Sequence, residues 1–213
     1  TVPARYARHG GADSGAALGC AAHSHDRGAG VLAAEGWVAA AIGEIFNPEE
    51  LLDGGDVAPA SLPALALRLA RENRLDRLAR ANGLFALALY ERAAHRLHLI
   101  TDRHASFPIH LWRKGGETIF AGQIFTLLGD PRVPRRANQA ALAQLFTTQR
   151  TFGRATSVAG VDALPAGAIV EIDGGGVRER RYRALAWRKP DFSEREGAAL
   201  LANALRNAAR RFA

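Results

Sequence analysis

The sequence predicts an α+β fold built from antiparallel strands. Most segments that are apolar enough to be strands occur in pairs, and each pair is joined by a short turn. Segments with helical periodicity lie between those pairs and do not alternate with single strands. Strict alternation of strand and helix would favour a parallel sheet, so this grouping favours antiparallel sheets with segregated helices.

The first third of the chain predicts a buried strand followed by helices. Residues 1–36 are irregular, with one short candidate strand over 16–22. Residues 37–45 are apolar on both faces, which indicates a buried strand. Asn47 and Pro48 are typical of a helix start, at the N-cap and first helical positions. Leucines at three- and four-residue steps then predict a helix over 61–81.

The rest of the chain predicts three hairpins and two helices. The strand pairs are 84–91 with 96–101, 109–112 with 118–121, and 168–173 with 177–183. A short amphipathic helix is predicted over 139–146. Ser193 and Glu196 form a capping box that begins a last helix ending at Phe212.

Composition indicates a globular protein. The 213 residues are 48% hydrophobic and 23% charged, without a signal-peptide pattern or an apolar run near the ~20 residues of a membrane helix. The net charge of +7 comes from arginines that are scattered apart from short groups at 178–181 and 206–211, without interleaved aromatic residues. We therefore expect neither a nucleic-acid nor a membrane partner. Cys20 is the single cysteine, which favours a cytoplasmic location.

Five motifs resemble the class II glutamine amidotransferase domain of asparagine synthases. In chain order they are Gly43-Glu44-Ile45-Phe46-Asn47, Asn82-Gly83-Leu84-Phe85-Ala86-Leu87-Ala88-Leu89-Tyr90, Thr101-Asp102-Arg103-His104-Ala105-Ser106-Phe107-Pro108-Ile109, Phe120-Ala121-Gly122-Gln123-Ile124 and Leu164-Pro165-Ala166-Gly167, with Tyr182 and Trp187 downstream. Their order and spacing carry the resemblance over about residues 8–213. It implies an N-terminal-nucleophile (Ntn) hydrolase-like sandwich of two antiparallel sheets flanked by helices.

The resemblance also implies how the whole protein is organised. Residues 1–186 would form the amidotransferase-like domain, and residues 187–213 the linker and first helix of a C-terminal synthetase domain. Since methionine is absent even at position 1, we expect a processed protein or a piece of a longer one, and the arginine- and alanine-rich composition favours a bacterial source. ATP and Mg²⁺ are expected in the synthetase domain and no cofactor in the amidotransferase-like domain. The synthetase domain is the expected partner in cis, and a homodimer is a further option.

The glutaminase pocket that the resemblance implies is depleted in this sequence. Gly10 stands where an arginine would bind the glutamine carboxylate, and Ile42 where an asparagine would donate to the oxyanion. Small or apolar residues at 58–61 replace an aspartate that would hold the amino group. Gly43 and Glu44 match the family and are interpreted as pocket remnants. Loss of one oxyanion donor typically costs ~10²–10³ in rate, so no catalytic residue is expected.

No residue qualifies as the nucleophile, which the resemblance implies to be an N-terminal cysteine with its own α-amino group as base. Thr1 is followed by residues that do not predict a strand, and it lies too close to the segment 9–13 that matches the family's His-Arg-Gly-Pro-Asp. Cys20 falls after that segment and is expected to be a small buried residue. His23 and His25 have a chelating spacing but no third ligand nearby, so no metal site is expected. Asp102 is expected to stabilise a turn.

These observations favour a non-catalytic amidotransferase-like domain of an ATP-dependent, amide-forming enzyme, similar to β-lactam synthetases and lasso-peptide cyclases. Two alternatives stay open. The first is a glutamine-hydrolysing asparagine synthase whose cysteine strand is not in this chain. The second is a free-standing binding module. Whether this domain is itself an enzyme is therefore open, whereas the parent protein is expected to be an amide ligase.

Overall fold

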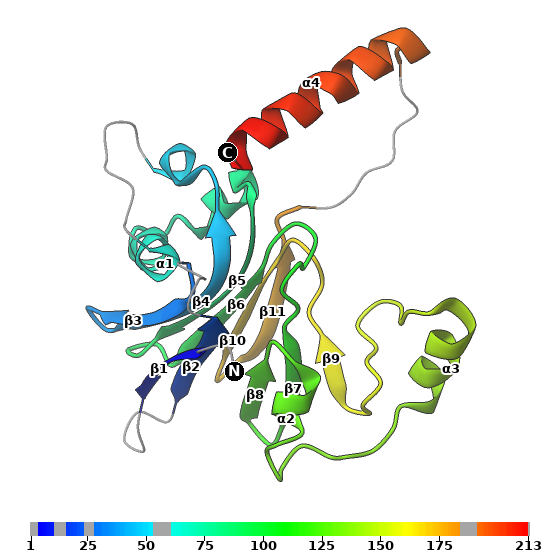
Figure 1. Ribbon diagram of the computed structural model, residues 1–213. Coiled ribbons are helices and arrows are strands. Elements are labelled where there is room, and N and C mark those ends of the chain that lie inside the picture. Colours follow the sequence, from blue (N-terminus) through cyan, green and yellow to red (C-terminus); the bar gives the residue numbers. More distant parts are fainter. Residues whose placement is uncertain (1–3, 11–15, 24–27, 53–60, 184–190, 213) are drawn as a thin grey trace. The chain divides into compact units, whose positions relative to one another are not determined.

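The computed structural model describes residues 4–10, 16–23, 28–52, 61–183 and 191–212. It divides into two units, residues 1–183 and 184–213 (Figure 1). The domain boundary expected after residue 186 falls outside the described residues, and the assignment of 187–213 to a synthetase domain stays a prediction.

A six-stranded sheet is the centre of the first unit. Its strand order is β11-β10-β6-β5-β4-β3, and every neighbouring pair is antiparallel. The strands are β3 (Gly30–Ala34), β4 (Trp37–Ile45), β5 (Gly83–Glu91), β6 (Arg96–Thr101), β10 (Ala168–Asp173) and β11 (Gly176–Arg181). The predicted strand over 37–45 and both predicted hairpins of this sheet are confirmed, with small shifts at their ends.

Two smaller sheets belong to the layer that faces the six-stranded sheet. β7 (His110–Lys114) pairs with β8 (Glu117–Ala121) and β9 (Val161–Ala163), while β1 (Ala4–Gly10) pairs with β2 (Ala17–His23). The predicted sandwich of antiparallel sheets flanked by helices is confirmed, although its second layer is divided. The expectation that no strand follows Thr1 is wrong, because cross-strand pairing with β2, from Ala4 opposite His23 to Gly10 opposite Ala17, forms β1 without a local apolar pattern.

Both faces of the six-stranded sheet are covered, which explains its continuous apolar runs. Neighbouring residues of a strand point to opposite faces, so a strand between two layers is apolar at every position. On one face the helix α1 (Leu62–Arg71) packs its leucines against alternate residues of β4 and β5 (Figure 1). On the other face, the intervening residues of β4 and β5 share a core with Leu18 of β2 and Leu111 of β7.

The single helix expected over 61–81 is in fact two helices. The Ser61 hydroxyl accepts a hydrogen bond from the Ala64 amide (3.4 Å) at the start of α1. α1 ends at Arg71, and a 3-10 helix follows over Leu75–Arg80. Asn73 lies between them with φ of 55°, a left-handed conformation that interrupts a right-handed helix.

The remaining helices of the first unit are short. Pro48–Leu51 forms one 3-10 turn, and α2 (Ile124–Leu127) packs against β8. The predicted helix over 139–146 is confirmed as α3 (Gln139–Thr148). Trp112 of β7 and Leu127 of α2 are the largest members of a third core, which lies on the outer face of the three-stranded sheet.

The second unit contains α4 (Glu194–Phe212), whose predicted capping box is confirmed. The Glu196 carboxylate accepts hydrogen bonds from the Ser193 amide (2.8 Å) and hydroxyl (2.7 Å). Leu200, Leu201 and Leu205 are 56%, 61% and 61% exposed within this unit. In the part of the chain that the structure describes, no helix is both long enough and apolar enough to cross a membrane.

Candidate functional site

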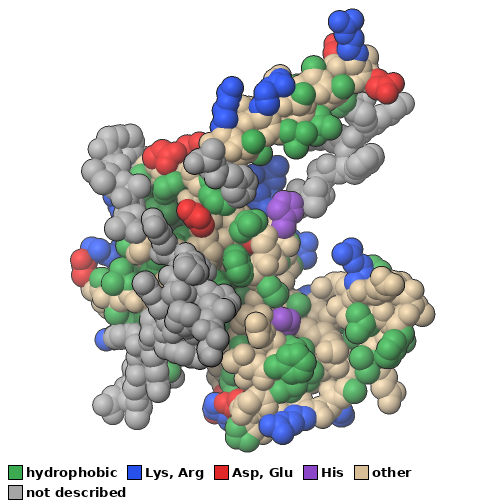
Figure 2. Space-filling view, viewed as in Figure 1, with side chains coloured by type: hydrophobic (Ala, Val, Ile, Leu, Met, Phe, Trp, Pro, Cys, Tyr) green, Lys and Arg blue, Asp and Glu red, His purple; other side chains and the backbone are tan. Residues whose placement is uncertain are grey.

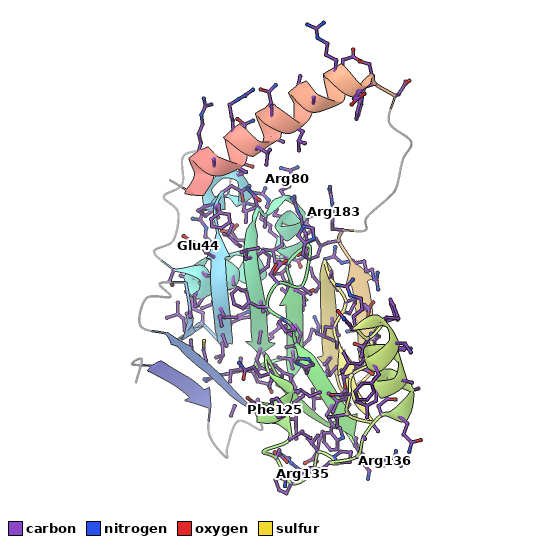
Figure 3. All side chains as sticks on the ribbon, turned by 45° about the vertical axis from the view of Figure 1, so that its right-hand side comes forward. Glu44, Arg80, Phe125, Arg135, Arg136 and Arg183 are labelled. Atoms are coloured by element: carbon purple, nitrogen blue, oxygen red, sulfur yellow. The ribbon has the colours of Figure 1, made fainter. Side chains whose placement is uncertain are left out.

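The candidate pocket lies at the C-terminal end of β4, where Ile42, Gly43 and Glu44 follow one another (Figure 3). Ile42 is half-buried and packs against the core between the two sheet layers. Gly43 is buried and has φ of 93°, a backbone conformation that side chains other than glycine rarely adopt. A Cβ atom at Gly43 would lie 2.0 Å from the Leu84 carbonyl oxygen, so only glycine fits there.

Phe107 covers Gly43. Its ring atom Cε2 lies 2.7 Å from the point where a Cβ of Gly43 would be, so the ring edge contacts this glycine directly. Phe107 and Ile42 pack against the same core, and neither side chain can donate or accept a hydrogen bond. Both of these side chains are therefore hydrocarbon, and Ile42 occupies the position where the resemblance implies an oxyanion donor.

Glu44 and Gly10 are the other two predicted pocket positions that the structure describes. The Glu44 side chain is exposed, and within the described ranges no hydrogen bond or ion pair reaches it. Gly10 is the last residue of β1, opposite Ala17, and contributes backbone pairing. Thr1 lies outside the described residues, as do residues 24–27, which include most of the His-Ser-His-Asp segment that begins at His23.

Cys20 differs from the expected small buried residue. Its side chain is half-buried, and its thiol donates a hydrogen bond to the Ala41 carbonyl oxygen at 3.2 Å. This contact places β2 against β4 beside Ile42. Among the described residues, no group of three or more His, Cys, Asp or Glu side chains is arranged to hold a metal ion.

Asp102 is the centre of a buried hydrogen-bond network. Its fully buried carboxylate accepts from the amides of Phe85 (3.1 Å), His104 (2.8 Å) and Ser106 (3.0 Å) and from the Ser106 hydroxyl (3.2 Å). A buried carboxylate is tolerated when several N–H groups satisfy it. The expected role of Asp102 in stabilising a turn is thus confirmed, and this turn leads directly into Phe107.

Thr101 connects the same turn to later motifs. Its hydroxyl donates to the Pro165 carbonyl (2.6 Å) and accepts from the Ala168 amide (3.3 Å). The Tyr182 hydroxyl donates to the Thr101 carbonyl (2.5 Å). Burial raises the pKa of Tyr182, and the negative charge of Asp102 raises it further, so this phenol stays a hydrogen-bond donor.

Asn47 connects the first two motifs. Its amide group donates to Glu50 (2.7 Å) and to the Arg80 carbonyl (3.2 Å), and its oxygen accepts from the Asn82 amide (2.7 Å). The expected helix N-cap hydrogen bond is absent among the described contacts of Asn47. This residue instead fastens the end of β4 to the start of β5.

The motif residues Asn47, Thr101 and Asp102 therefore hold the ends of the strands together. At the position of the implied pocket, the side chains of Ile42 and Phe107 are hydrocarbon. Residues 31–183 match the family model described as glutamine amidotransferase domain. This chain belongs to that family. The resemblance to class II glutamine amidotransferases is confirmed at this level.

Two solved structures are more distantly similar to this chain. Glutamine phosphoribosylpyrophosphate amidotransferase from B. subtilis, complexed with ADP and GMP, has a TM-score of 0.46 and 11% sequence identity. A second structure, described as the allosteric regulatory enzyme of purine biosynthesis, has the same two values. Each alignment covers 75% of this chain and 32% of the other, so this family member spans about a third of their length. No curated protein matches the chain in sequence.

Phe107 is the site residue that sequence reasoning missed. It stands inside a recognised motif, but nothing in the motif places its ring over a glycine 64 positions earlier in the chain. A large aromatic residue directly before Pro108, in a turn that is otherwise small and polar, was the available signal.

Proposed function

We propose that this family member is a non-catalytic amidotransferase-like domain of an ATP-dependent, amide-forming enzyme similar to β-lactam synthetases and lasso-peptide cyclases. The observation that carries the proposal is the packing of Phe107 on Gly43 beside Ile42. In the proposal the fold serves as a packing partner of a synthetase domain in cis. That domain would bind ATP and Mg²⁺, and the protein would work in the cytoplasm.

The chemistry of glutamine hydrolysis supports this choice. The reaction needs a donor for the oxyanion and a cation for the substrate carboxylate. Ile42 has no donor, and Gly10 has no charge. Since each lost oxyanion donor typically costs ~10²–10³ in rate, a nucleophile added at the N-terminus would not by itself restore efficient hydrolysis.

Glutamine hydrolysis is the second candidate function. The family description favours it, and so do Gly43 and Glu44, which match the family's pocket. In that case the Phe107 ring would have to move away from Gly43 when glutamine enters.

A measurement of glutamine binding distinguishes the two candidate functions better than a measurement of hydrolysis. Without a nucleophile, both candidates predict that glutamine is not hydrolysed. We would titrate glutamine into residues 1–213 in a calorimeter, with the wild type, Phe107→Ala and Phe107→Ala/Ile42→Asn. The proposal expects no saturable heat in any of them. Phe120→Ala is the matched control, because Phe120 packs against the same core away from Gly43.

Three results would contradict the proposal. Saturable glutamine binding by the wild type would favour the glutaminase. Binding by Phe107→Ala but not by Phe120→Ala would show that the polar part of the pocket is intact beneath the ring. Release of ammonia from glutamine that a covalent glutamine analogue abolishes would contradict it as well.

A further inference from the structure

An exposed aromatic and cationic surface lies at the opposite end of the first unit from Glu44 (Figure 3). We call it the α2–α3 surface and define it by Phe125, Leu128, Arg135, Arg136, Leu142, Leu145 and Phe146. Phe125 and Phe146 are 80% and 83% exposed. Side chains of this size are usually buried, and an exposed apolar patch rimmed by polar groups is typical of an interaction site.

A groove of about 590 Å³ forms the middle of this surface. Its walls include Phe125 of α2, Leu128 directly after α2, Leu142 of α3, and Val158. Backbone hydrogen bonds join the segment before α3 to the segment after it: the Asn138 amide donates to the Ser157 carbonyl (2.9 Å), and the Ala159 amide donates to the Arg136 carbonyl (2.8 Å). These two hydrogen bonds hold together the segments that carry Ala137 and Val158 in the groove wall.

One face of α3 continues the groove outward. Leu142, Leu145 and Phe146 are three and four residues apart, so they share one side of the helix. Ala141, which is 1% exposed, anchors the helix to the body, and the Asn138 side chain caps its first turn. Leu145 is 39% exposed, and together with Phe146 it extends the apolar wall beyond Leu142.

The segment 131–161, which contains most of the residues that line the groove, has charges of one sign. Between Asp130 and Asp162 the chain has no acidic residue, and its five charged residues are Arg132, Arg135, Arg136, Arg150 and Arg154. On the face that Figure 2 shows, no acidic side chain is visible over the lobe that carries α3, where hydrophobic side chains lie exposed.

Among the described residues, no acidic side chain pairs with Arg135 or Arg136. Arg132 is paired with Asp130 and Glu117, and Arg154 with Glu179 and Asp162. The Arg135 guanidinium donates to the Leu128 carbonyl (3.1 and 3.2 Å), which fixes it at the groove without neutralising it. The Arg136 guanidinium has no hydrogen bond or ion pair with any residue that the structure describes.

We propose that the α2–α3 surface docks an acidic amphipathic helix of a partner protein. Apolar side chains of that helix would enter the groove beside Phe125 and Phe146, and its carboxylates would pair with Arg135 and Arg136. A single-stranded nucleic acid fits less well, because the groove is lined by Leu128, Leu142 and Val158 and not by a row of aromatic platforms.

Fluorescence anisotropy with the whole chain would test this assignment. The probe is a labelled peptide of about 16 residues, or about four helical turns, with leucines at three- and four-residue steps and glutamates on the flanks. A second peptide keeps the leucines and replaces every glutamate with lysine, and a labelled oligouridylate is the third probe. We expect saturable binding of the acidic peptide, at least about tenfold weaker binding of the other two, and loss of affinity in high salt.

Variants show whether binding uses this surface. Phe146→Ala should weaken binding of the acidic peptide by about tenfold or more, since aromatic anchors dominate such interfaces. Arg136→Glu should shift the preference towards the lysine peptide. Phe192→Ala and Arg180→Glu are the matched controls, because both residues are exposed and lie outside the α2–α3 surface, and neither should change the affinity.

Four outcomes would overturn the proposal. They are no saturable binding of the acidic peptide, equal affinity for both peptides, tighter binding of the oligouridylate, or equal losses in the surface variants and their controls. Each variant alters an exposed side chain only, and its melting curve would verify that the fold is retained.

Discussion

At the scale of single residues, Ile42 packs against the core between the sheet layers, at the position where the resemblance to asparagine synthases implies a hydrogen-bond donor. Ile42→Asn should therefore lower the free energy of unfolding by about 1–3 kcal/mol, because apolar burial is lost and an amide must be satisfied. It should not create glutamine binding, since Phe107 still covers Gly43. Melting curves with and without glutamine would measure both effects, and Ile42→Val is the control that removes one methyl group. A rise in Tm with glutamine would show that the protein still binds glutamine and would contradict the prediction.

Ala105 is strained in the turn that Asp102 organises. Its φ is 51°, a left-handed conformation that costs an L-residue with a Cβ roughly 1–2 kcal/mol. Ala105→Gly should raise the free energy of unfolding by about 1 kcal/mol, after allowance for the greater freedom of glycine in the unfolded chain. Denaturant unfolding would measure the gain. Ala94→Gly is the matched control, because Ala94 lies in a turn without positive φ, and it should give no gain.

His98 should make stability depend on pH. It is 5% exposed, it stacks on Trp37 with 5.9 Å between ring centroids, and both ring nitrogens lack a hydrogen-bond partner among the described groups. Burial lowers the pKa of His98, and the nearby Glu171 carboxylate opposes this shift only in part.

The sign of this dependence follows from the lowered pKa. Below the usual histidine pKa of about 6.5, the unfolded chain binds a proton that the folded protein resists. The contribution of His98 is thus complete above that pH and is lost as the pH falls through the lowered, folded pKa. Urea unfolding between about pH 7.5 and 5 should show this loss, and His98→Phe should reduce it. Part of the loss should remain in that variant, because burial lowers the pKa of His110 as well. An unchanged pH profile in His98→Phe would rule out this role.

Residue roles were predictable from sequence where they depend on near neighbours. Asp102 accepts from residues 104 and 106, so its turn could be anticipated. Asn47 looked like a helix cap because the next residues favour a helix start, yet its partners are Arg80 and Asn82. Phe107 reaches Gly43 through the folded structure alone, and no pattern within either motif contains that contact.

At the scale of elements, hairpins were predicted well because a turn and two apolar strands lie together in the sequence. β5 and β6 show this, because residues 86–91 pair one to one with residues 96–101 across a short turn. β1, β3 and β9 were missed. β3 forms a hairpin with β4, but its residues 30–34 lie in the stretch that the sequence marks as irregular. β9 has three residues and depends on pairing with β7, and β1 depends on pairing with β2. The break of the helix at Asn73 was missed because leucine periodicity continues on both sides of it.

The α4 helix should open more easily than the central strands when no partner covers it. Its leucines at 200, 201 and 205 remain more than half exposed, so burial contributes little to its stability. Amide hydrogen exchange should therefore be faster in α4 than in β5 for a monomeric sample. Leu201→Gln/Leu205→Gln should leave exchange in β5 unchanged and reduce self-association at high concentration. Protection of α4 equal to that of β5 in a strict monomer would contradict this prediction.

At the scale of the whole molecule, the division after Arg183 predicts two parts of unequal importance for folding. All three hydrophobic cores belong to residues 1–183. A protein that ends at Arg183 should thus melt within about 2 °C of the full chain, since a change of 1 kcal/mol shifts Tm by roughly 2–4 °C at this size. Thermal unfolding followed by circular dichroism would measure it, with removal of residues 176–183 as the destabilising control. A markedly lower Tm without α4 would show that the second unit supports the first.

The hydrogen bonds around Asp102 and Thr101 also set the order of folding. Thr101 bonds Pro165, which is 64 residues away, and Tyr182, which is 81 residues away, while Asn47 and Asn82 are 35 residues apart. Contacts between such distant residues require large loops to close, which places folding in the range of about milliseconds to seconds. The β5–β6 hairpin can form as soon as it is synthesised, but Thr101 at its end must wait for its last partner. During synthesis on the ribosome, this corner of the protein therefore stays open until Tyr182 has emerged.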